Sequence, residues 1–223
     1  MTKKAIIFGS IGTIVETSEL QHNAFNRAFE EANIDWNWSR DDYRDMLKNP
    51  GGRQRISDYA EKMGVEVNAH DLHARKTAIF DDMMVNEGLT PRPGVLHLIQ
   101  FAKDSGMKVG FATTTSRNNV QAIFIALNNC LQRSAFDFVG DDESVVATKP
   151  DPEIYYRTMT ALGVSAAQSL AIEDTGVSMQ AALAAGLECI AFPGAYADQD
   201  AFDGALRIVD SVEPHVLPFL GAA

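Results

Sequence analysis

Four side chains suited to binding a phosphate ester and a divalent cation occur at regular places in this 223-residue chain. Thr113 and the pair Glu173–Asp174 each follow a short apolar segment, and Lys149 lies in a proline-rich segment between them. A threonine hydroxyl and its neighbouring backbone amides donate to phosphoryl oxygens, and a lysine ammonium neutralises their charge. Paired carboxylates supply the oxygen ligands that Mg²⁺ prefers. The order of these residues favours a site for a phosphate group and a hard cation.

Short apolar segments alternate with longer amphipathic ones, which predicts strands alternating with helices. We expect strands at about 5–8, 108–113, 136–139, 170–172, 189–192 and 207–209, and helices at 95–104, 117–127, 151–162 and 177–185. Such alternation predicts an α/β fold with a parallel sheet covered by helices on both faces. Because ligands of such sheets bind beyond the C-terminal strand ends, the four side chains should lie together.

One long stretch interrupts the alternation. Between about residues 16 and 90 only helical segments are expected, at 19–32, 41–48, 54–63 and 70–85, and Thr90-Pro91-Arg92-Pro93-Gly94 then forms a stiff connector. We therefore expect a helical domain of residues 16–90 inserted into a core domain of residues 1–15 and 91–223.

The charge and hydropathy of the chain exclude several classes of protein. Nineteen Lys and Arg against thirty Asp and Glu give a net charge of −11, which argues against a nucleic-acid partner and against a surface that seeks anionic lipid. No apolar stretch approaches the roughly 20 residues of a membrane helix, so no membrane partner is expected.

The N-terminal segment and the two cysteines indicate whether the protein is secreted and whether it forms disulfides. The apolar run after Lys4 resembles the start of a signal peptide, but Glu16 and Glu19 follow at once, so we expect no secretion. Cys130 and Cys189 are the only cysteines. Two cysteines are too few for a disulfide scaffold, and we expect both to be reduced, buried thiols in a cytoplasmic protein.

The segments at the expected strand ends resemble motifs of the haloacid dehalogenase (HAD) superfamily, within it the beta-phosphoglucomutase-like branch and its CbbY-like sugar-phosphate phosphatases. The resemblance runs from about residue 4 to residue 209. It is carried by Gly51-Gly52-Arg53-Gln54-Arg55, Arg92-Pro93-Gly94-Val95, Ala112-Thr113-Thr114-Thr115, Lys149-Pro150-Asp151-Pro152 and Glu173-Asp174. It implies a Rossmann-like core with a helical cap inserted after the first strand, in agreement with the helical block.

The resemblance also implies roles for individual core residues. Thr113 and Thr114 match the family's second, phosphate-binding motif, and Lys149 matches the third. Glu173 and Asp174 match the acidic pair that holds Mg²⁺. The implied ligand is a small phosphorylated metabolite.

In the cap, the resemblance points to residues that would face the substrate. Arg55 matches an arginine of the specificity loop, Lys76 matches a cap lysine, and Thr17 matches a residue near the hinge. Relatives usually carry a histidine four residues after that threonine, where this chain has Gln21. The neighbouring His22 is displaced by about 100° around a helix, and we expect it at the surface.

The resemblance fails at the first motif, Asp-x-Asp-Gly-Thr, which supplies the family's nucleophile and its general acid and base. Gly9 stands at the nucleophile position and Ile11 at the acid/base position. Gly9 has no side chain that could attack phosphorus, and Ile11 cannot transfer a proton, a role that contributes about 10²–10⁴-fold. Ser10 lies between them and, because alternate side chains of an extended segment face opposite ways, we expect it to face away from the site.

Loss of these carboxylates changes the expected metal and ligand chemistry. The Mg²⁺ ligands that remain are the Ile11 carbonyl, Glu173 and Asp174, so we expect weakened metal binding. The cations around the site are retained, so a phosphorylated molecule could bind with little or no Mg²⁺. Without a ligand, Lys149 is expected to pair with Asp174.

Two functions remain open from the sequence. One is a catalytically impaired protein of hydrolase lineage that binds a phosphate ester as a pseudoenzyme. The other is an active phosphatase with weak or altered phosphoryl-transfer chemistry, since positioning and electrostatics alone accelerate this reaction. A purely structural role would not require Thr113, Lys149, Glu173 and Asp174 to persist together.

Overall fold

The computed structural model describes residues 3–47, 51–127, 130–197 and 202–217. The chain divides into two compact units, one made of residues 1–16 and 89–223 and the other of residues 17–88. The first unit is called the core unit below, and the second the helical unit.

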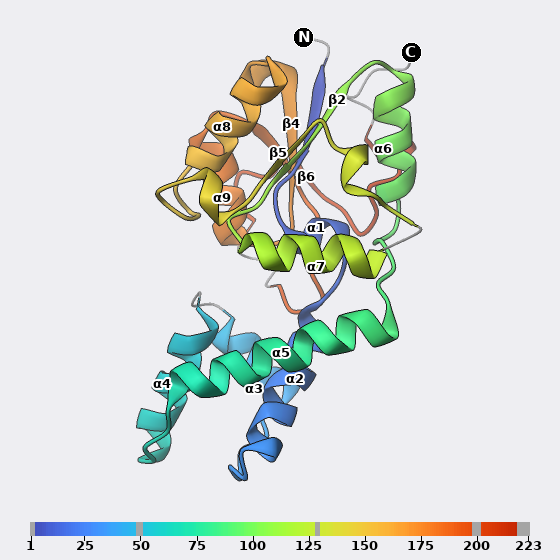
Figure 1. Ribbon diagram of the computed structural model, residues 1–223. Helices are drawn as coiled ribbons and strands as arrows, with labels where there is room; N and C mark the ends of the chain where they lie inside the picture. Colours follow the sequence, from blue (N-terminus) through green and yellow to red (C-terminus); the bar gives the residue numbers. More distant parts are fainter. Residues whose placement is uncertain (1–2, 48–50, 128–129, 198–201, 218–223) are drawn as a thin grey trace. The chain divides into compact units, whose positions relative to one another are not determined.

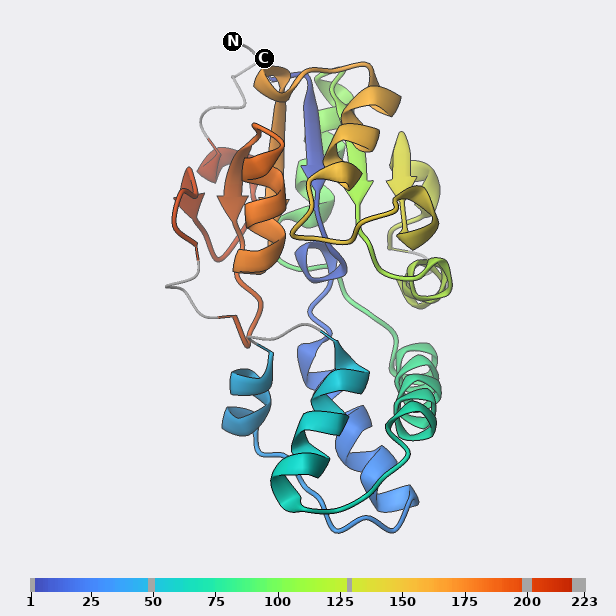
Figure 2. The same cartoon turned by 90° about the vertical axis from the view of Figure 1, so that its left-hand side faces the viewer.

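The core unit is built on a parallel sheet with the strand order β3-β2-β1-β4-β5-β6 (Figure 2). The strands are β1 Ala5–Phe8, β2 Lys108–Ala112, β3 Phe138–Gly140, β4 Ser169–Glu173, β5 Glu188–Ala191 and β6 Arg207–Ile208. Every residue of β1 and β4 is buried, because helices cover both faces of a parallel sheet. The expected parallel α/β core is confirmed.

Helices lie on both faces of this sheet, with α8 and α9 on one face and α6 on the other (Figure 1). The helices of the core unit are α1 Ile11–Ile14, α6 Val95–Asp104, α7 Arg117–Leu127, α8 Glu153–Leu162 and α9 Gly176–Ala184. Short 3₁₀ turns are η1 Arg133–Ala135, η2 Asp142–Ser144, η3 Ala166–Gln168 and η5 Pro214–Val216. Met159 and Leu162 of α8 and Met179 of α9 pack into one apolar cluster with β1 and β4.

Most boundaries lie within two residues of those expected, and α6 and α7 coincide with them. The strand expected at 136–139 instead spans Phe138–Gly140, where it pairs with β2. Phe136 is not in the strand because it follows the turn η1, and its ring packs against Phe8 and Phe111. The ring thus serves the apolar core rather than the sheet.

The helical unit consists of α2 Ser18–Glu31, α3 Arg40–Met46, α4 Gly52–Met63 and α5 Ala69–Glu87. The expected end of the helix at 41–48 lies outside the described residues. Aromatic side chains fill the centre of the unit. Phe29 lies 4.7 Å from Trp38 and 5.4 Å from Trp36 between ring centroids, and Phe25 lies 4.9 Å from Trp38. These contacts hold α2 against the segment before α3.

The two glycines at the start of α4, Gly51 and Gly52, are required for different structural reasons. Gly51 has a φ of 102°, a conformation that side-chain-bearing residues rarely adopt. Gly52 lies so close to α5 that a Cβ there would approach the His73 Nε2 within 2.6 Å. The Gly51-Gly52 pair therefore lets α4 begin in contact with α5, which positions Arg55 one turn later.

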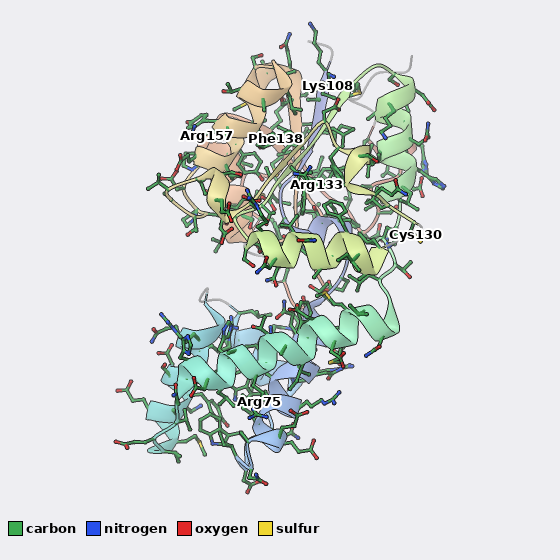
Figure 3. All side chains as sticks on the ribbon, in the orientation of Figure 1. Arg75, Lys108, Cys130, Arg133, Phe138 and Arg157 are labelled. Carbon is green, nitrogen blue, oxygen red and sulfur yellow. The ribbon has the colours of Figure 1, made fainter. Side chains whose placement is uncertain are left out.

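The cysteines differ in exposure. Cys189 is buried in β5, as expected, whereas Cys130 follows α7 and is exposed (Figure 3). The expectation that both thiols are buried is therefore wrong for Cys130, because its segment has left the helix that packs on the sheet. Among the described residues, no helix is long and apolar enough to cross a membrane.

Replacing Phe29 by alanine should destabilise the helical unit by about 3–5 kcal/mol, because a fully buried aromatic side chain is lost from a packed core. Both tryptophans of the chain, Trp36 and Trp38, lie in this unit, so urea unfolding followed by tryptophan fluorescence measures the change. Exposed Arg27→Ala is the control and should shift the midpoint little. Equal effects of the two substitutions would contradict the proposed core.

Candidate functional site

The C-terminal end of β1 carries no catalytic carboxylate. The Gly9 amide donates to the Ile172 carbonyl of β4 at 2.9 Å, so the backbone passes close beside the neighbouring strand. A Cβ atom built on Gly9 would overlap the Glu173 carboxylate and the Tyr155 hydroxyl. The space that a side chain at position 9 would need is therefore taken by these two groups.

A buried ion pair occupies the centre of this strand end. The Lys149 Nζ lies 2.6 Å from the Glu173 Oε1, with the two side chains 6% and 0% exposed. The ammonium also donates to the Gly9 carbonyl, and the Tyr155 hydroxyl donates to the same Glu173 oxygen. The expected pairing of Lys149 with Asp174 is thus wrong, because Glu173, the last residue of β4, is the carboxylate that points toward β1.

Burial dominates the electrostatics of the acidic pair. It raises the pKa of Glu173 although the Lys149 charge opposes the change. Burial also raises the pKa of Asp174, opposed by the Ser10 hydroxyl and by the charges of Lys149 and Arg92. The pKa of Tyr155 lies well above its ordinary value for the same reason, which keeps the phenol a hydrogen-bond donor.

Ser10 lies on the site side of the chain. Its hydroxyl donates to the Asp174 Oδ1, so the expectation that Ser10 faces away is wrong. Ser10 is still extended, with a φ of −150° and a ψ of 169°, and precedes α1. Its hydroxyl meets Asp174, whereas a Cβ on the preceding Gly9 would meet Glu173, because the acidic pair offers a carboxylate to each of the two positions. A Cβ atom on Gly12 would also overlap Asp174, so the turn is tightly closed around that carboxylate.

Arg92 fixes the same turn from the connector before α6. Its Nη1 donates to the Gly12 carbonyl at 2.7 Å and to the Phe192 carbonyl at 2.8 Å, and its guanidinium lies 3.4 Å from the centre of the Phe192 ring. Sequence reasoning quoted Arg92 as part of a motif without giving it a role. The structure makes it the brace between the ends of β1 and β5.

The two threonines after β2 differ from each other. Thr113 is buried, and its hydroxyl accepts a hydrogen bond from the Thr115 amide at 3.1 Å, which closes the turn. Thr114 is partly exposed. Both follow the strand that pairs with β1, so they share an edge of the sheet with the ion pair. Their phosphate-binding role stays a prediction.

In the helical unit, two cationic side chains are buried against the same aromatic ring. The Arg55 guanidinium lies 5.9 Å and the Lys76 Nζ 4.9 Å from the centre of the Phe25 ring. Burial lowers the pKa of Arg55 and, together with the Arg55 charge, lowers the pKa of Lys76 to about 7. Arg55 also lines a cavity of about 320 Å³ in this unit, with Met46, Gly51 and Tyr59 among its other walls.

The residues at the start of α2 meet this cluster. The Thr17 carbonyl accepts the Gln21 amide at 2.9 Å, and the Gln21 side-chain oxygen accepts a hydrogen bond from Lys76. His22 is buried, in contrast to its expected surface position. Its Nε2 lies 2.7 Å from the Trp38 carbonyl, because its face of α2 packs on the aromatic core rather than on solvent.

Sequence reasoning missed one residue of the core site, Tyr155. The feature that could have indicated it is a tyrosine among the buried positions of α8, which also include the apolar Ile154 and Met159. Spacing alone does not distinguish such a ring from an ordinary core residue. Only the contact with Glu173 reveals its place in the site.

Comparison with known proteins decides the family. Residues 6–192 match the family model of the haloacid dehalogenase-like hydrolases. The chain belongs to this family. It is 36% identical over 211 residues to protein CbbY of Cereibacter sphaeroides, covering 93% of this chain and 92% of that protein. It is 34% identical over 232 residues to the plasmid-encoded CbbY of Cupriavidus necator, covering 99% and 91%.

Solved structures of the same HAD branch agree with this assignment. The crystal structure of CbbY from Rhodobacter sphaeroides in complex with phosphate matches with a TM-score of 0.82 and 35% identity, covering 95% of this chain and 96% of that chain. A putative beta-phosphoglucomutase from Thermotoga maritima matches with a TM-score of 0.79 and 25% identity, covering 96% and 98%. The expected CbbY-like and beta-phosphoglucomutase-like resemblance is confirmed.

Lys149→Met should destabilise the core unit by about 3 kcal/mol or more, because it leaves the buried Glu173 carboxylate without its cation. The double substitution Lys149→Met/Glu173→Gln should recover most of the loss. Urea unfolding followed by circular dichroism measures both. If the double variant is as unstable as the single one, Lys149 stabilises the core unit through contacts other than its ion pair with Glu173.

Proposed function

We propose that this HAD-family protein binds a small phosphorylated metabolite and is catalytically impaired. The observation that carries the proposal is the end of β1, where Gly9 and Ile11 replace the expected carboxylates and where Glu173 and Tyr155 fill the space of the nucleophile. Without a carboxylate at position 9, no aspartyl-phosphate can form. The lineage is that of sugar-phosphate phosphatases, and the fold is retained without its nucleophile.

Retained polar groups support phosphate binding in the core unit. We place Thr113, Thr114 and Lys149 around the phosphate, at the sheet edge where ligands of parallel sheets bind. Related CbbY proteins have been crystallised with phosphate and, as a mutant, with xylulose-1,5-bisphosphate. These complexes support a phosphorylated small molecule as the ligand class, without naming the molecule for this chain.

We propose that residues 17–88 form a cap domain that carries ligand contacts of its own. Among the described residues of this unit, Arg55 and Lys76 are buried cations, and Thr17 and Gln21 lie at the start of its first helix. A guanidinium matches phosphate oxygens in two-point geometry. Arg55 is therefore the candidate phosphate contact of the helical unit.

We infer that the fit for Mg²⁺ is poor. The Glu173 Oε1 already accepts from Lys149 and Tyr155, and the Asp174 Oδ1 accepts from Ser10. A cation would compete with the Lys149 ammonium for the same carboxylate, which disfavours near-octahedral coordination. The Glu173 Oε2 has no hydrogen-bond partner among the described residues, and one free oxygen does not make a magnesium site. The binding we propose therefore does not depend on a metal.

A second candidate function is weak phosphoryl transfer, favoured by the hydrogen bond between Ser10 and Asp174. A serine hydroxyl bonded to a carboxylate has the arrangement of an activated nucleophile or of a water-orienting pair. This geometry gives the active-phosphatase alternative a specific residue. Loss of any measured turnover on Ser10→Ala would support it.

Assayed with a panel of sugar phosphates, the wild type should release no phosphate above a buffer control. Gly9→Asp/Ile11→Asp restores both carboxylates but must displace Glu173 and Tyr155, so we expect more activity when Tyr155→Phe is added. Phosphate release measured by a colorimetric assay compares the three proteins. Robust wild-type turnover that survives stringent purification would contradict the proposal that the protein is catalytically impaired.

Binding of inorganic phosphate and of a sugar bisphosphate, measured by calorimetry, should change less than threefold when EDTA replaces Mg²⁺. Arg55→Gln should weaken bisphosphate binding about tenfold or more, because a charge-assisted contact is lost. Arg75→Gln is the matched control on an exposed arginine that pairs with Glu31. Strict dependence on Mg²⁺ would contradict the metal-independent mode.

A further inference from the structure

Lys76 has an unusual environment for a lysine. Its side chain is buried, and its Nζ lies 4.9 Å from the centre of the Phe25 ring and 4.8 Å from that of Phe80. Its ammonium nitrogen donates a hydrogen bond to the side-chain amide oxygen of Gln21, an uncharged group. Two aromatic walls and one amide thus surround the amine.

The charged groups near this amine are mostly of its own sign. Arg55 of α4 faces the same Phe25 ring, and the charge of Arg55 acts on Lys76. On α5 itself, His73 lies near the cluster, and Asp81 is the carboxylate that acts in the opposite sense. No carboxylate of the described residues lies within ion-pair distance of Lys76. The neighbouring Arg75, labelled in Figure 3, is exposed and pairs with Glu31 at 3.5 Å.

This environment favours the uncharged amine. An ammonium loses hydration when it is buried, and it is repelled by a second buried cation. Both effects act on Lys76, whose pKa falls to about 7, so a large fraction of the side chain carries a lone pair at neutral pH. Burial in an apolar pocket beside another cation is the recognised way in which a lysine becomes a nucleophile toward carbonyl groups.

We propose that Lys76 captures the carbonyl group of a small phosphorylated aldehyde as an imine, while Arg55 holds its phosphate. The Lys76 nitrogen attacks the carbonyl carbon, and the carbonyl oxygen takes up a proton to give a carbinolamine. Loss of one water molecule then leaves the C=N bond, with no change of oxidation state. Gln21 acts as a positioning residue, since its amide oxygen accepts an N–H of the amine without fixing it as an ammonium.

This inference rests on the proposed binding of a phosphorylated metabolite and adds the chemical class of that metabolite. Arg55 supplies the anion contact that brings the aldehyde to the amine, since a guanidinium pairs readily with phosphate oxygens. Its position on the ring that Lys76 also contacts puts the two functions in one cluster. The function so added is covalent and reversible retention of an aldehyde.

The test is reductive trapping of the full-length protein with glycolaldehyde phosphate and cyanoborohydride, followed by peptide mass mapping. We expect one adduct, on Lys76, whose yield rises from pH 6 to pH 8 as the amine loses its proton. Unphosphorylated glycolaldehyde should modify the same residue at least tenfold more slowly. An adduct that is spread over exposed lysines, with Lys76 not enriched, overturns the proposal.

Variants separate chemistry from folding. Gln21→Glu should favour the charged form of Lys76 and reduce trapping at pH 7 roughly fivefold, which is the fall in the uncharged fraction when a pKa of about 7 rises by one unit, with recovery near pH 9. Lys76→Gln should remove the adduct, whereas Lys103→Gln, on an exposed lysine of the core unit, should leave it unchanged. Unaltered trapping in Gln21→Glu at pH 7 would contradict the role of the uncharged amine.

The same experiment distinguishes failure of this inference from failure of the proposed function. Binding of 2-hydroxyethyl phosphate, which has no carbonyl group, reports phosphate recognition alone. If it binds and no Lys76 adduct forms, the imine is wrong and metabolite binding stands. If it does not bind and glycolaldehyde still modifies Lys76 selectively, the reactive amine stands and phosphate recognition fails.

Discussion

The buried ion pair between Lys149 and Glu173 is the interaction on which the core site depends. A carboxylate that is fully enclosed between strands is costly to keep charged unless a cation lies against it. Lys149 meets that requirement at 2.6 Å and also ties itself to the carbonyl of Gly9. Because Gly9 has no side chain, Glu173 and Tyr155 approach β1 at the place where a Cβ atom on residue 9 would lie. The close packing of the Lys149–Glu173 ion pair against β1 therefore requires glycine at position 9.

Most of the fold could be predicted because it follows from local patterns. Apolar runs bounded by turn residues gave β1, β2 and β4 within a residue or two, and the absence of such runs between Val15 and Pro91 indicated the helical unit. The order of the strands in the sheet was less accessible, since pairing joins residues far apart in the chain. The family resemblance, rather than spacing, led to the Rossmann-like arrangement.

The site was predicted less well, for a physical reason. Residue type at a strand end tells which groups approach the edge, but the choice of partner depends on how the neighbouring strand ends and turns pack against one another. Ser10 was expected to face away and instead bonds Asp174, because the turn after β4 brings that carboxylate to the residue that precedes α1. His22 was expected in solvent and instead contacts the Trp38 carbonyl, because the aromatic core extends around α2. Both errors arose where tertiary packing overrides a periodicity rule.

The sheet has a further property that follows from its edges. Its outer strands are its shortest, three residues in β3 and two in β6. Edge strands this short offer few unpaired backbone N–H and C=O groups to a strand from another chain. The fully buried β1 and β4, whose apolar side chains would favour aggregation if exposed, lie at the centre of the strand order. Placing the shortest strands at the two edges therefore limits edge-to-edge aggregation of the sheet. This protection does not depend on any chemistry at the site.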